Sequence, residues 1–358
     1  MSRPFPCEDC SAEHRQRGAV VAAHVNMHDV AKLAGVSQRT VSNVVNDFVH
    51  VAPATRERVK RAIDALNYRP HVAAQSLRRG RTGLLGLVLP EIKGYFAELA
   101  ELVERQAHEH GATLLIDQTG GGTRDRELLL LDQYRSSLID GLILHPLTIT
   151  ASDLIARDLG VPVVLLGERI DASELLHVSI DNVAAAHTAT SHLIEVGRRR
   201  IVAVGTPATR RMSSPAVQRY QGYLDAMGQA GFAVPSDLAI ETNEWTRETG
   251  RRLAERIAAI RPRVDGAFCF NDLLALGLLR GLADQGISVP DDIAVVGWDD
   301  IDDAAYSNPR LTTIAPDKQA IAVAAIRGAL RLDAPSSASP TIDFTIRARA
   351  STGAATVP

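Results

Sequence analysis

The chain has 358 residues, of which 46% are hydrophobic and 23% charged, and its net charge is −3. This composition is typical of a globular protein with two or three folding units. Three cysteines are too few for a disulfide framework, no apolar run approaches the roughly eighteen residues of a membrane span, and no secretory signal is recognisable at the N-terminus, so we expect a cytoplasmic protein without a membrane partner.

The first 26 residues are expected to be a disordered leader, and Met27 is a candidate start of the chain. Cys7 and Cys10 have a spacing seen in zinc sites, with His14 and His24 as the only nearby partners. Four ligands at a recognised spacing are not present, so we predict no metal and no cofactor.

The segment that begins at Met27 predicts a helix-turn-helix. An amphipathic stretch over 28–34 is followed by a glycine turn at Gly35 and by a second helical stretch over 37–46. Ser37 can cap this second helix by accepting a hydrogen bond from a free backbone N–H. A third helix is expected from Pro53, which suits a first turn, and it should end before 67–70.

The second helical stretch has two faces. Val41, Val44 and Val45 recur at helical spacing and predict the buried face. The side chains expected to point outward, toward base edges, are Gln38, Arg39, Ser42, Asn43 and Asn46. Between residues 27 and 82 ten basic residues stand against four acidic ones, so only this end of the chain is expected to bind a polyanion.

A short run over 71–79 follows this head. Such a short helix should be only marginally stable alone, because helix nucleation is costly and few hydrogen bonds repay it. Marginal stability would allow a small shift elsewhere in the protein to form or melt it.

From Leu84 onward, short aliphatic strands alternate with helices. The expected strands are 84–89, 113–116, 141–144, 161–166, 178–180, 201–204, 266–270 and 293–296. The expected helices are 97–110, 124–138, 183–196, 215–230, 246–260 and 272–285. This pattern predicts parallel sheets covered on both faces, divided between two lobes, with ligands bound beyond the carboxyl ends of the strands.

Six motifs carry a family resemblance. They are DVAKLAGVS at 29–37, TVSNVVN at 40–46, LNYRP at 66–70, ND at 271–272, GWDD at 297–300 and LTTI at 311–314. Together they resemble the LacI/GalR family of bacterial transcription regulators. The resemblance implies an all-α helix-turn-helix head and an α/β two-lobed body like that of periplasmic binding proteins.

The resemblance also implies a division of the chain. We expect a leader over 1–26, a helix-turn-helix DNA-binding domain over 27–70, and a hinge helix with a linker over 71–82. A two-lobed effector-binding and dimerisation domain would follow over 83–349, and a tail over 350–358.

The implied partner of the head is double-stranded operator DNA. The implied contacts are Ser37, Gln38, Arg39, Thr40, Ser42, Asn43, Asn46, His50, Tyr68, Ala74, Leu77 and Arg78. Gln38 and Arg39 would read bases, whereas Thr40, Ser42, Asn46 and His50 would meet phosphates. Asn43 stands where an arginine is common in the family, so the base preference there is open. Leu77 would wedge into a base step of the minor groove from a hinge helix paired across a homodimer, unless it simply packs on the body.

The implied partner of the body is a small effector, a sugar or a sugar derivative. The implied contacts are Tyr95, Phe96, Arg219, Trp245, Asn271 and Asp299. Arg219 has forked donors that suit adjacent hydroxyls, and a carboxylate such as Asp299 accepts strongly from them. The alternatives are ordinary packing for the three aromatic residues and an ion pair between Arg219 and Asp299. Lys93-Gly94-Tyr95-Phe96 also departs from the Asn-Pro-Phe-Phe-like stretch that is more usual in the family.

These expectations predict a sequence-specific regulator, a repressor of carbohydrate-utilisation genes that responds to its effector. We expect no enzymatic activity, because no catalytic set can be read from the sequence. The alternative is a sugar-binding protein whose DNA-binding head no longer functions.

Overall fold

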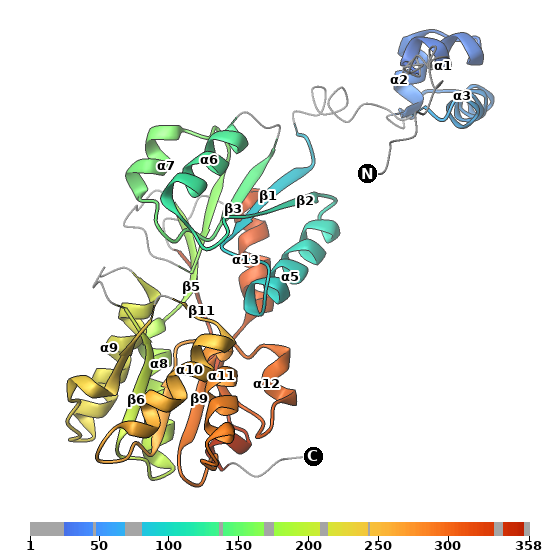
Figure 1. Ribbon diagram of the computed structural model, residues 1–358. Helices are drawn as coiled ribbons and strands as arrows, with labels where there is room; N and C mark the ends of the chain where they lie inside the picture. Colours follow the sequence, from blue (N-terminus) through green and yellow to red (C-terminus); the bar gives the residue numbers. More distant parts are fainter. Residues whose placement is uncertain are drawn as a thin grey trace, which may run out of the picture. The chain divides into compact units, whose positions relative to one another are not determined.

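Figure 1 shows the computed structural model of the protein. It describes residues 25–45, 48–68, 81–135, 139–167, 175–207, 214–242, 244–332 and 339–353. The chain divides into two units, residues 1–78 and residues 79–358. The expected hinge helix over 71–79 and residues 1–24 of the expected leader (1–26) lie outside the described residues, whereas Asn26 is described and caps α1.

The first unit contains three short helices in its described part, α1 (Met27–Ala34), α2 (Gln38–Val45) and α3 (Pro53–Ala65). Val30, Val41 and Val59, one from each helix, are fully buried and meet in a common core. The expected helix-turn-helix and the third helix are therefore present, with Pro53 in the first turn of α3 as predicted.

Local hydrogen bonds explain where the helices of this unit begin. Asn26 caps α1, since its side chain accepts from the N–H of His28 at 2.8 Å and its own N–H donates to Asp29 at 2.9 Å. Gly35, with a φ of 62°, ends α1 in the left-handed conformation that suits glycine. Ser37 Oγ accepts from the N–H of Thr40 at 3.1 Å, as expected for the cap of α2.

The second unit has two lobes, each built on a six-stranded sheet (Figure 1). Lobe 1 has the strand order β11-β5-β4-β3-β1-β2. Its strands are β1 (Leu84–Leu89), β2 (Thr113–Gln118), β3 (Gly141–Leu144), β4 (Val163–Leu166), β5 (Leu176–Ile180) and β11 (Thr341–Ile342). Its helices are α5 (Tyr95–Glu109), α6 (Arg124–Arg135), α7 (Ala151–Arg157) and α13 (Lys318–Ala329).

Lobe 2 has the strand order β12-β10-β9-β8-β6-β7. Its strands are β6 (Ile201–Thr206), β7 (Ala239–Glu241), β8 (Gly266–Cys269), β9 (Ala294–Trp298), β10 (Thr312–Pro316) and β12 (Phe344–Arg347). Its α-helices are α8 (Asn182–Glu195), α9 (Pro215–Gln229), α10 (Arg247–Ala259), α11 (Asp272–Asp284) and α12 (Asp302–Tyr306), and its short 3-10 turns are η1 (Ser236–Leu238) and η2 (Ala350–Thr352).

The pairing of strands is parallel throughout both sheets, except that β12 runs antiparallel to β10. The chain passes between the lobes after β5, after β10 and after β11. Because of the second crossing, α13 packs on lobe 1 although the strand before it belongs to lobe 2.

The fold class predicted from the sequence is confirmed. All eight expected strands and all six expected body helices are present, with ends that differ by a few residues. Among the described residues of the second unit, the α-helices and strands that were not expected are α7, β7, α12, β10, α13, β11 and β12, and the 3-10 turns η1 and η2 were not expected either. Across the described parts of the chain, no helix is both long and apolar enough to cross a membrane.

Candidate DNA interface and effector site

The recognition helix α2 presents its first residues to solvent. Gln38 and Arg39 are exposed, and Asn43 is partly exposed further along the helix. Gln38 Nε2 lies 3.1 Å from His28 Nδ1, so α1 restrains this side chain. Sequence reasoning missed His28, whose partner is ten residues away. An exposed amide beside an exposed guanidinium is the chemistry that reads adenine and guanine edges in the major groove.

Ser42 is buried, so the expectation that its side chain points outward is wrong, and its contact with DNA stays a prediction. Ser42 is only 6% exposed and lies beside Val41 on the packed side of α2. The buried face of this short helix is wider than the valine stripe, because it packs against both α1 and α3. A small side chain allows that close approach.

Tyr68 is also buried, at 6% exposed, and contributes to the core of the first unit. Burial raises the pKa of its phenol. Packing is the role that the structure gives to its ring, and the DNA contact stays a prediction.

The remaining predicted DNA contacts differ in how they lie. The hydroxyls of Ser37 and Thr40 are 2.9 Å apart and bond to each other. His50 is exposed, and its ring meets the edge of Phe48 in a loop held by Arg56, which donates to the Phe48 carbonyl at 2.8 Å. Asn46, Ala74, Leu77 and Arg78 lie outside the described residues.

The predicted effector residues come from both lobes of the second unit. Tyr95 and Phe96 open α5 in lobe 1, whereas Asn271 and Asp299 follow β8 and β9 in lobe 2. Asp299 raises the pKa of the Tyr95 phenol, which burial raises most, so the two lobes are electrostatically coupled here. These predicted contacts thus lie near the carboxyl ends of parallel strands, where ligands bind in such sheets, and the interlobe effector site stays a prediction.

Arg219 is held in place by lobe 2. Its Nε donates to Asn182 Oδ1 at 3.0 Å, and its Nη1 donates to the carbonyl oxygen of Phe270. The guanidinium carbon lies 4.0 Å from the ring centre of Trp298 and 5.6 Å from that of Trp245, within cation–π range. Burial lowers the pKa of Arg219 to about 10, so it is still charged at neutral pH.

The predicted alternative for Arg219, an ion pair with Asp299, is not formed among the described residues. Burial raises the pKa of Asp299 to about 7, against the opposing charges of Arg219 and Lys318. Asp272, which is fully buried, accepts from the Thr313 hydroxyl at 2.7 Å and from the N–H of Ile301 at 3.0 Å. Burial and the nearby Asp299 raise the pKa of Asp272.

His145 faces the same site from lobe 1 and was missed in the sequence analysis. It directly follows β3, so the rule that located Asn271 and Asp299 could have found it. Its ring lies edge-on to Phe96 at 4.8 Å, and burial lowers its pKa to about 4, with Arg219 acting in the same direction. The buried Nδ1 has no hydrogen-bond partner among the described residues, so a bound molecule could satisfy it.

Two of the predicted effector contacts, Asn271 and Trp245, already form hydrogen bonds within the protein. Asn271 Oδ1 caps α11 by accepting from the N–H of Leu274 at 2.9 Å, and Asn271 Nδ2 donates to the Trp245 carbonyl at 3.3 Å. The Trp245 indole N–H donates to the Thr242 carbonyl, and its ring packs against Phe270. The structure shows packing for the aromatic residues, which is one of the two alternatives drawn from the sequence, and their contact with an effector stays a prediction.

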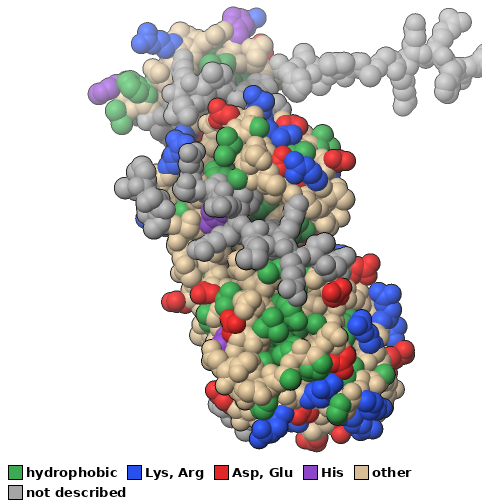
Figure 2. Space-filling model, turned by 90° about the vertical axis from the view of Figure 1, so that its left-hand side faces the viewer, with side chains coloured by type: hydrophobic (Ala, Val, Ile, Leu, Met, Phe, Trp, Pro, Cys, Tyr) green, Lys and Arg blue, Asp and Glu red, His purple; other side chains and the backbone are tan. Residues whose placement is uncertain are grey.

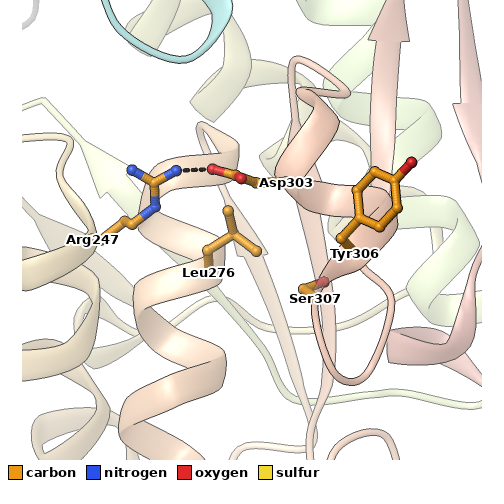
Figure 3. Close-up of a pocket in the computed structure, with 5 residues that line it drawn as sticks. All are labelled: Arg247, Leu276, Asp303, Tyr306 and Ser307. Atoms are coloured by element: carbon orange, nitrogen blue, oxygen red, sulfur yellow. Dashed lines mark hydrogen bonds and ion pairs between the residues drawn. The ribbon is translucent and has the colours of Figure 1, made fainter.

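A separate hollow of about 470 Å³ opens on the surface of lobe 2. It is lined by Arg247, Leu276, Asp303, Tyr306 and Ser307 (Figure 3). Arg247 and Asp303 point toward each other and form an ion pair, while the Tyr306 ring is 81% exposed. None of the predicted effector contacts lines this hollow, so it is distinct from the interlobe site.

The side of the second unit seen in Figure 2 has no extended surface of one charge. On lobe 2, apolar side chains gather at the centre, and basic and acidic side chains alternate along the lower edge. A surface of mixed sign does not attract a polyanion strongly. This contrasts with the excess of basic residues between 27 and 82.

Comparisons with known proteins match both units. Residues 26–71 match the bacterial regulatory proteins of the lacI family, and residues 190–352 match the periplasmic binding protein-like domain. The HTH-type transcriptional repressor PurR of Vibrio atlanticus (strain LGP32) is 32% identical over 296 residues, which are 82% of this chain and 87% of that protein.

Two solved structures resemble the chain over most of its length. The complex of the transcriptional regulator CelR with cellobiose is 28% identical, with a TM-score of 0.67, and covers 91% of this chain and 99% of that one. The lac repressor dimer bound to operator and the anti-inducer ONPF is 25% identical, with a TM-score of 0.80, over 92% of this chain and 99% of that one. The chain belongs to the lacI family of bacterial regulatory proteins and is a DNA-binding transcription repressor.

Proposed function

We propose that this repressor binds a near-palindromic operator as a homodimer and that a small sugar or sugar derivative between its lobes controls the binding. The genes under its control would then be carbohydrate-utilisation genes. The observation that carries this proposal is that Arg219, which lies against the rings of Trp298 and Trp245, and Asp299 are both partly buried where the two lobes meet. Forked donors, a carboxylate acceptor and flat apolar walls are the groups that bind a polyol ring.

Relatives support more than one effector. The CelR structure contains cellobiose, which favours a sugar. The curated relatives named PurR are purine-related regulators, which favours a purine base instead. The neutral imidazole of His145, with one donor and one acceptor nitrogen, and the rings of Phe96 and Trp245 also suit a flat heteroaromatic base. A purine base is therefore the second candidate.

Calorimetry on the full chain separates these candidates. The titrants are cellobiose, D-glucose, hypoxanthine and guanine, each added to the wild type and to Arg219→Ala. We expect one class to bind the wild type and to lose most of its affinity in the variant, because Arg219 supplies the charged donors. Operator binding without effector should be unchanged in Arg219→Ala, since this residue lies in the second unit. Equal effector affinity in both proteins would contradict the role of Arg219.

The operator can be found without knowing the effector. Sequencing the genomic fragments that the purified protein retains should yield a near-palindrome whose half-sites match a two-fold dimer. Neighbouring genes of carbohydrate use would support the sugar, and genes of purine metabolism would support the second candidate. Light scattering during size-exclusion chromatography tests the homodimer, and a monomeric mass at working concentration would contradict it.

A repressor that acts on the chromosome would work in the cytoplasm, which is where we place it. The alternative of a sugar-binding protein with a non-functional head predicts effector binding without any affinity for duplex DNA. Retention of no specific fragment at low salt would favour that alternative.

A further inference from the structure

A set of hydrogen bonds joins the two lobes beside the proposed effector site. Glu98 on α5 pairs with Lys318, the first residue of α13, with 2.5 Å between Glu98 Oε2 and Lys318 Nζ. Both residues belong to lobe 1, and each also contacts lobe 2. Glu98 Oε1 accepts from the N–H of Asp302 at 2.8 Å, and Lys318 Nζ donates to the carbonyl oxygen of Asp300 at 2.8 Å.

The loop that these two residues contact also carries Asp299. The backbone of Asp299 has a φ of 114° and that of Asp300 a φ of 48°, conformations that L side chains adopt at a cost. The loop keeps this shape because it is held at several points. The N–H of Asp299 donates to the Ile314 carbonyl at 2.9 Å, and Arg349 donates to the Asp300 carboxylate at 2.7 Å.

We propose that Glu98 and Lys318 form an interlobe clasp that positions the Asp299 carboxylate and ties the closure of the lobes to binding at that carboxylate. Only two contacts from lobe 1 and a strained loop of lobe 2 are needed for this coupling. If the lobes separate, the loop loses the donor and the acceptor that lobe 1 supplies, and Asp299 is free to turn away. The link to an effector rests on the proposed function.

The charges of the clasp also act on Asp299 in opposite directions. Lys318 lowers the pKa of Asp299, whereas Glu98 raises it. Arg219 on α9 lowers it as well, Asp272 at the start of α11 is a further carboxyl beside it, and Tyr95 on α5 faces it from lobe 1. Removal of the Lys318 charge should therefore raise the pKa of Asp299, and removal of the Glu98 charge should lower it.

Hydrogen–deuterium exchange of the full chain without effector tests the clasp directly. In Glu98→Ala and in Lys318→Ala, we expect the peptide covering residues 299–304 to exchange about tenfold faster than in the wild type, because opening of the loop becomes easier. Arg105→Ala is the matched control. Arg105 also lies on α5 and donates to Gln319 of α13 at 2.6 Å, but both of these residues belong to lobe 1. Unchanged exchange in the clasp variants, or an equal rise in the control, would overturn the proposal.

A pH titration followed by carbon-13 NMR measures the pKa of Asp299. A merely structural role of Glu98 and Lys318 would leave this pKa unchanged. The aspartate carboxyls of the full chain are labelled, and the Asp299 signal is assigned by its loss in Asp299→Asn. Glu98→Gln, which keeps an acceptor for the Asp302 N–H, should lower the pKa of Asp299, and Lys318→Met should raise it, each by about half a pH unit or more. Shifts of the same sign, or none, would contradict the clasp.

These two experiments do not depend on the identity of the effector. If none of cellobiose, D-glucose, hypoxanthine and guanine binds the wild type, none of these four compounds is the effector, while exchange and titration still decide the clasp. If one of the four binds, its affinity should fall about tenfold in Lys318→Ala and stay unchanged in Arg105→Ala. An unchanged affinity in Lys318→Ala would separate the clasp from effector binding.

Discussion

Burial changes what the charged side chains of the interlobe site can do. Arg219 keeps its charge because its pKa, although lowered to about 10, stays well above neutral pH. Asp299 is instead present in both its protonated and its ionised form near neutral pH, since burial raises its pKa to about 7. A carboxyl of this kind is a strong acceptor only when ionised, so the strength of Asp299 as the proposed acceptor for an effector depends on pH.

Asp299→Asn should alter how stability depends on pH. The folded protein holds the Asp299 proton more tightly than the unfolded chain does, so the free energy of unfolding of the wild type falls as pH rises from about 4 through about 7. The variant cannot ionise here, and its stability should gain on the wild type by about 1–4 kcal/mol between pH 4 and pH 8.

Urea unfolding at a series of pH values measures this difference. Asp125→Asn, which alters an exposed carboxylate in the first turn of α6, is the control and should run parallel to the wild type. An Asp299→Asn profile that also runs parallel would show that this carboxyl has an ordinary pKa.

Arg39→Ala should weaken operator binding and relax the preference at one base pair. A bidentate contact from an exposed arginine to guanine contributes about 1–3 kcal/mol to discrimination, or about tenfold or more in affinity. Gel-shift titrations on the operator and on its single-base variants measure both effects. Arg126→Ala removes an equal charge from an exposed site on α6 and should change neither. An undiminished base preference in Arg39→Ala would reject base reading by this residue.

Residue types and spacing located the two faces of α2 only in part. Val41 and Val44 are buried as predicted and Val45 only partly, but Ser42 is also buried, because a helix packed on two neighbours hides more than its apolar residues. In the body, adjacency to a strand end located Asn271 and Asp299, whereas His145 satisfied the same rule and was overlooked. Lys318 could not be found in this way, since its role depends on a crossing between lobes that no local pattern shows.

At the scale of elements, length and periodicity predicted the strands of the sheet centres and the longer helices. These strands are nearly continuous apolar runs, such as β1, which is buried from its second residue onward. The missed elements have weaker patterns. The helix α13 is rich in alanine, with no clear polar face, and β12 lies at a sheet edge with alternate residues exposed. Their places are fixed by tertiary packing rather than by local sequence.

Asn26→Ala should destabilise the start of the first helix. Asn26 accepts from two backbone N–H groups of α1 and completes a capping box with Asp29, and loss of such a cap costs about 0.5–2 kcal/mol. Hydrogen exchange over residues 27–34 should rise accordingly. Ser214→Ala is the control, because Ser214 holds the same position before α9 without a side-chain cap bond, and exchange over 215–220 should stay unchanged. Equal effects at both helices would contradict a specific role of the Asn26 cap.

At the scale of the whole molecule, the head (the first unit) and the body (the second unit) carry different candidate sites. The head presents an exposed amide and guanidinium on a helix of a basic segment, and the body holds the partly buried Arg219 and Asp299, the proposed effector contacts, between two lobes that the chain joins three times. The proposed function requires that the two lobes move relative to each other about these three crossings. Coupling between effector and DNA then requires only that one arrangement of the lobes favours the DNA-bound state, which typically amounts to about 1–3 kcal/mol.

Fluorescence anisotropy of a labelled operator, titrated with the full chain at increasing salt, tests this account most directly. Without effector, the logarithm of the affinity should fall linearly with the logarithm of salt concentration, since basic side chains of the head displace counterions from phosphates. A saturating sugar or purine effector should change the affinity about 5–150-fold at fixed salt, in either direction. No affinity for any duplex at low salt, or an affinity that no effector alters, would contradict the account.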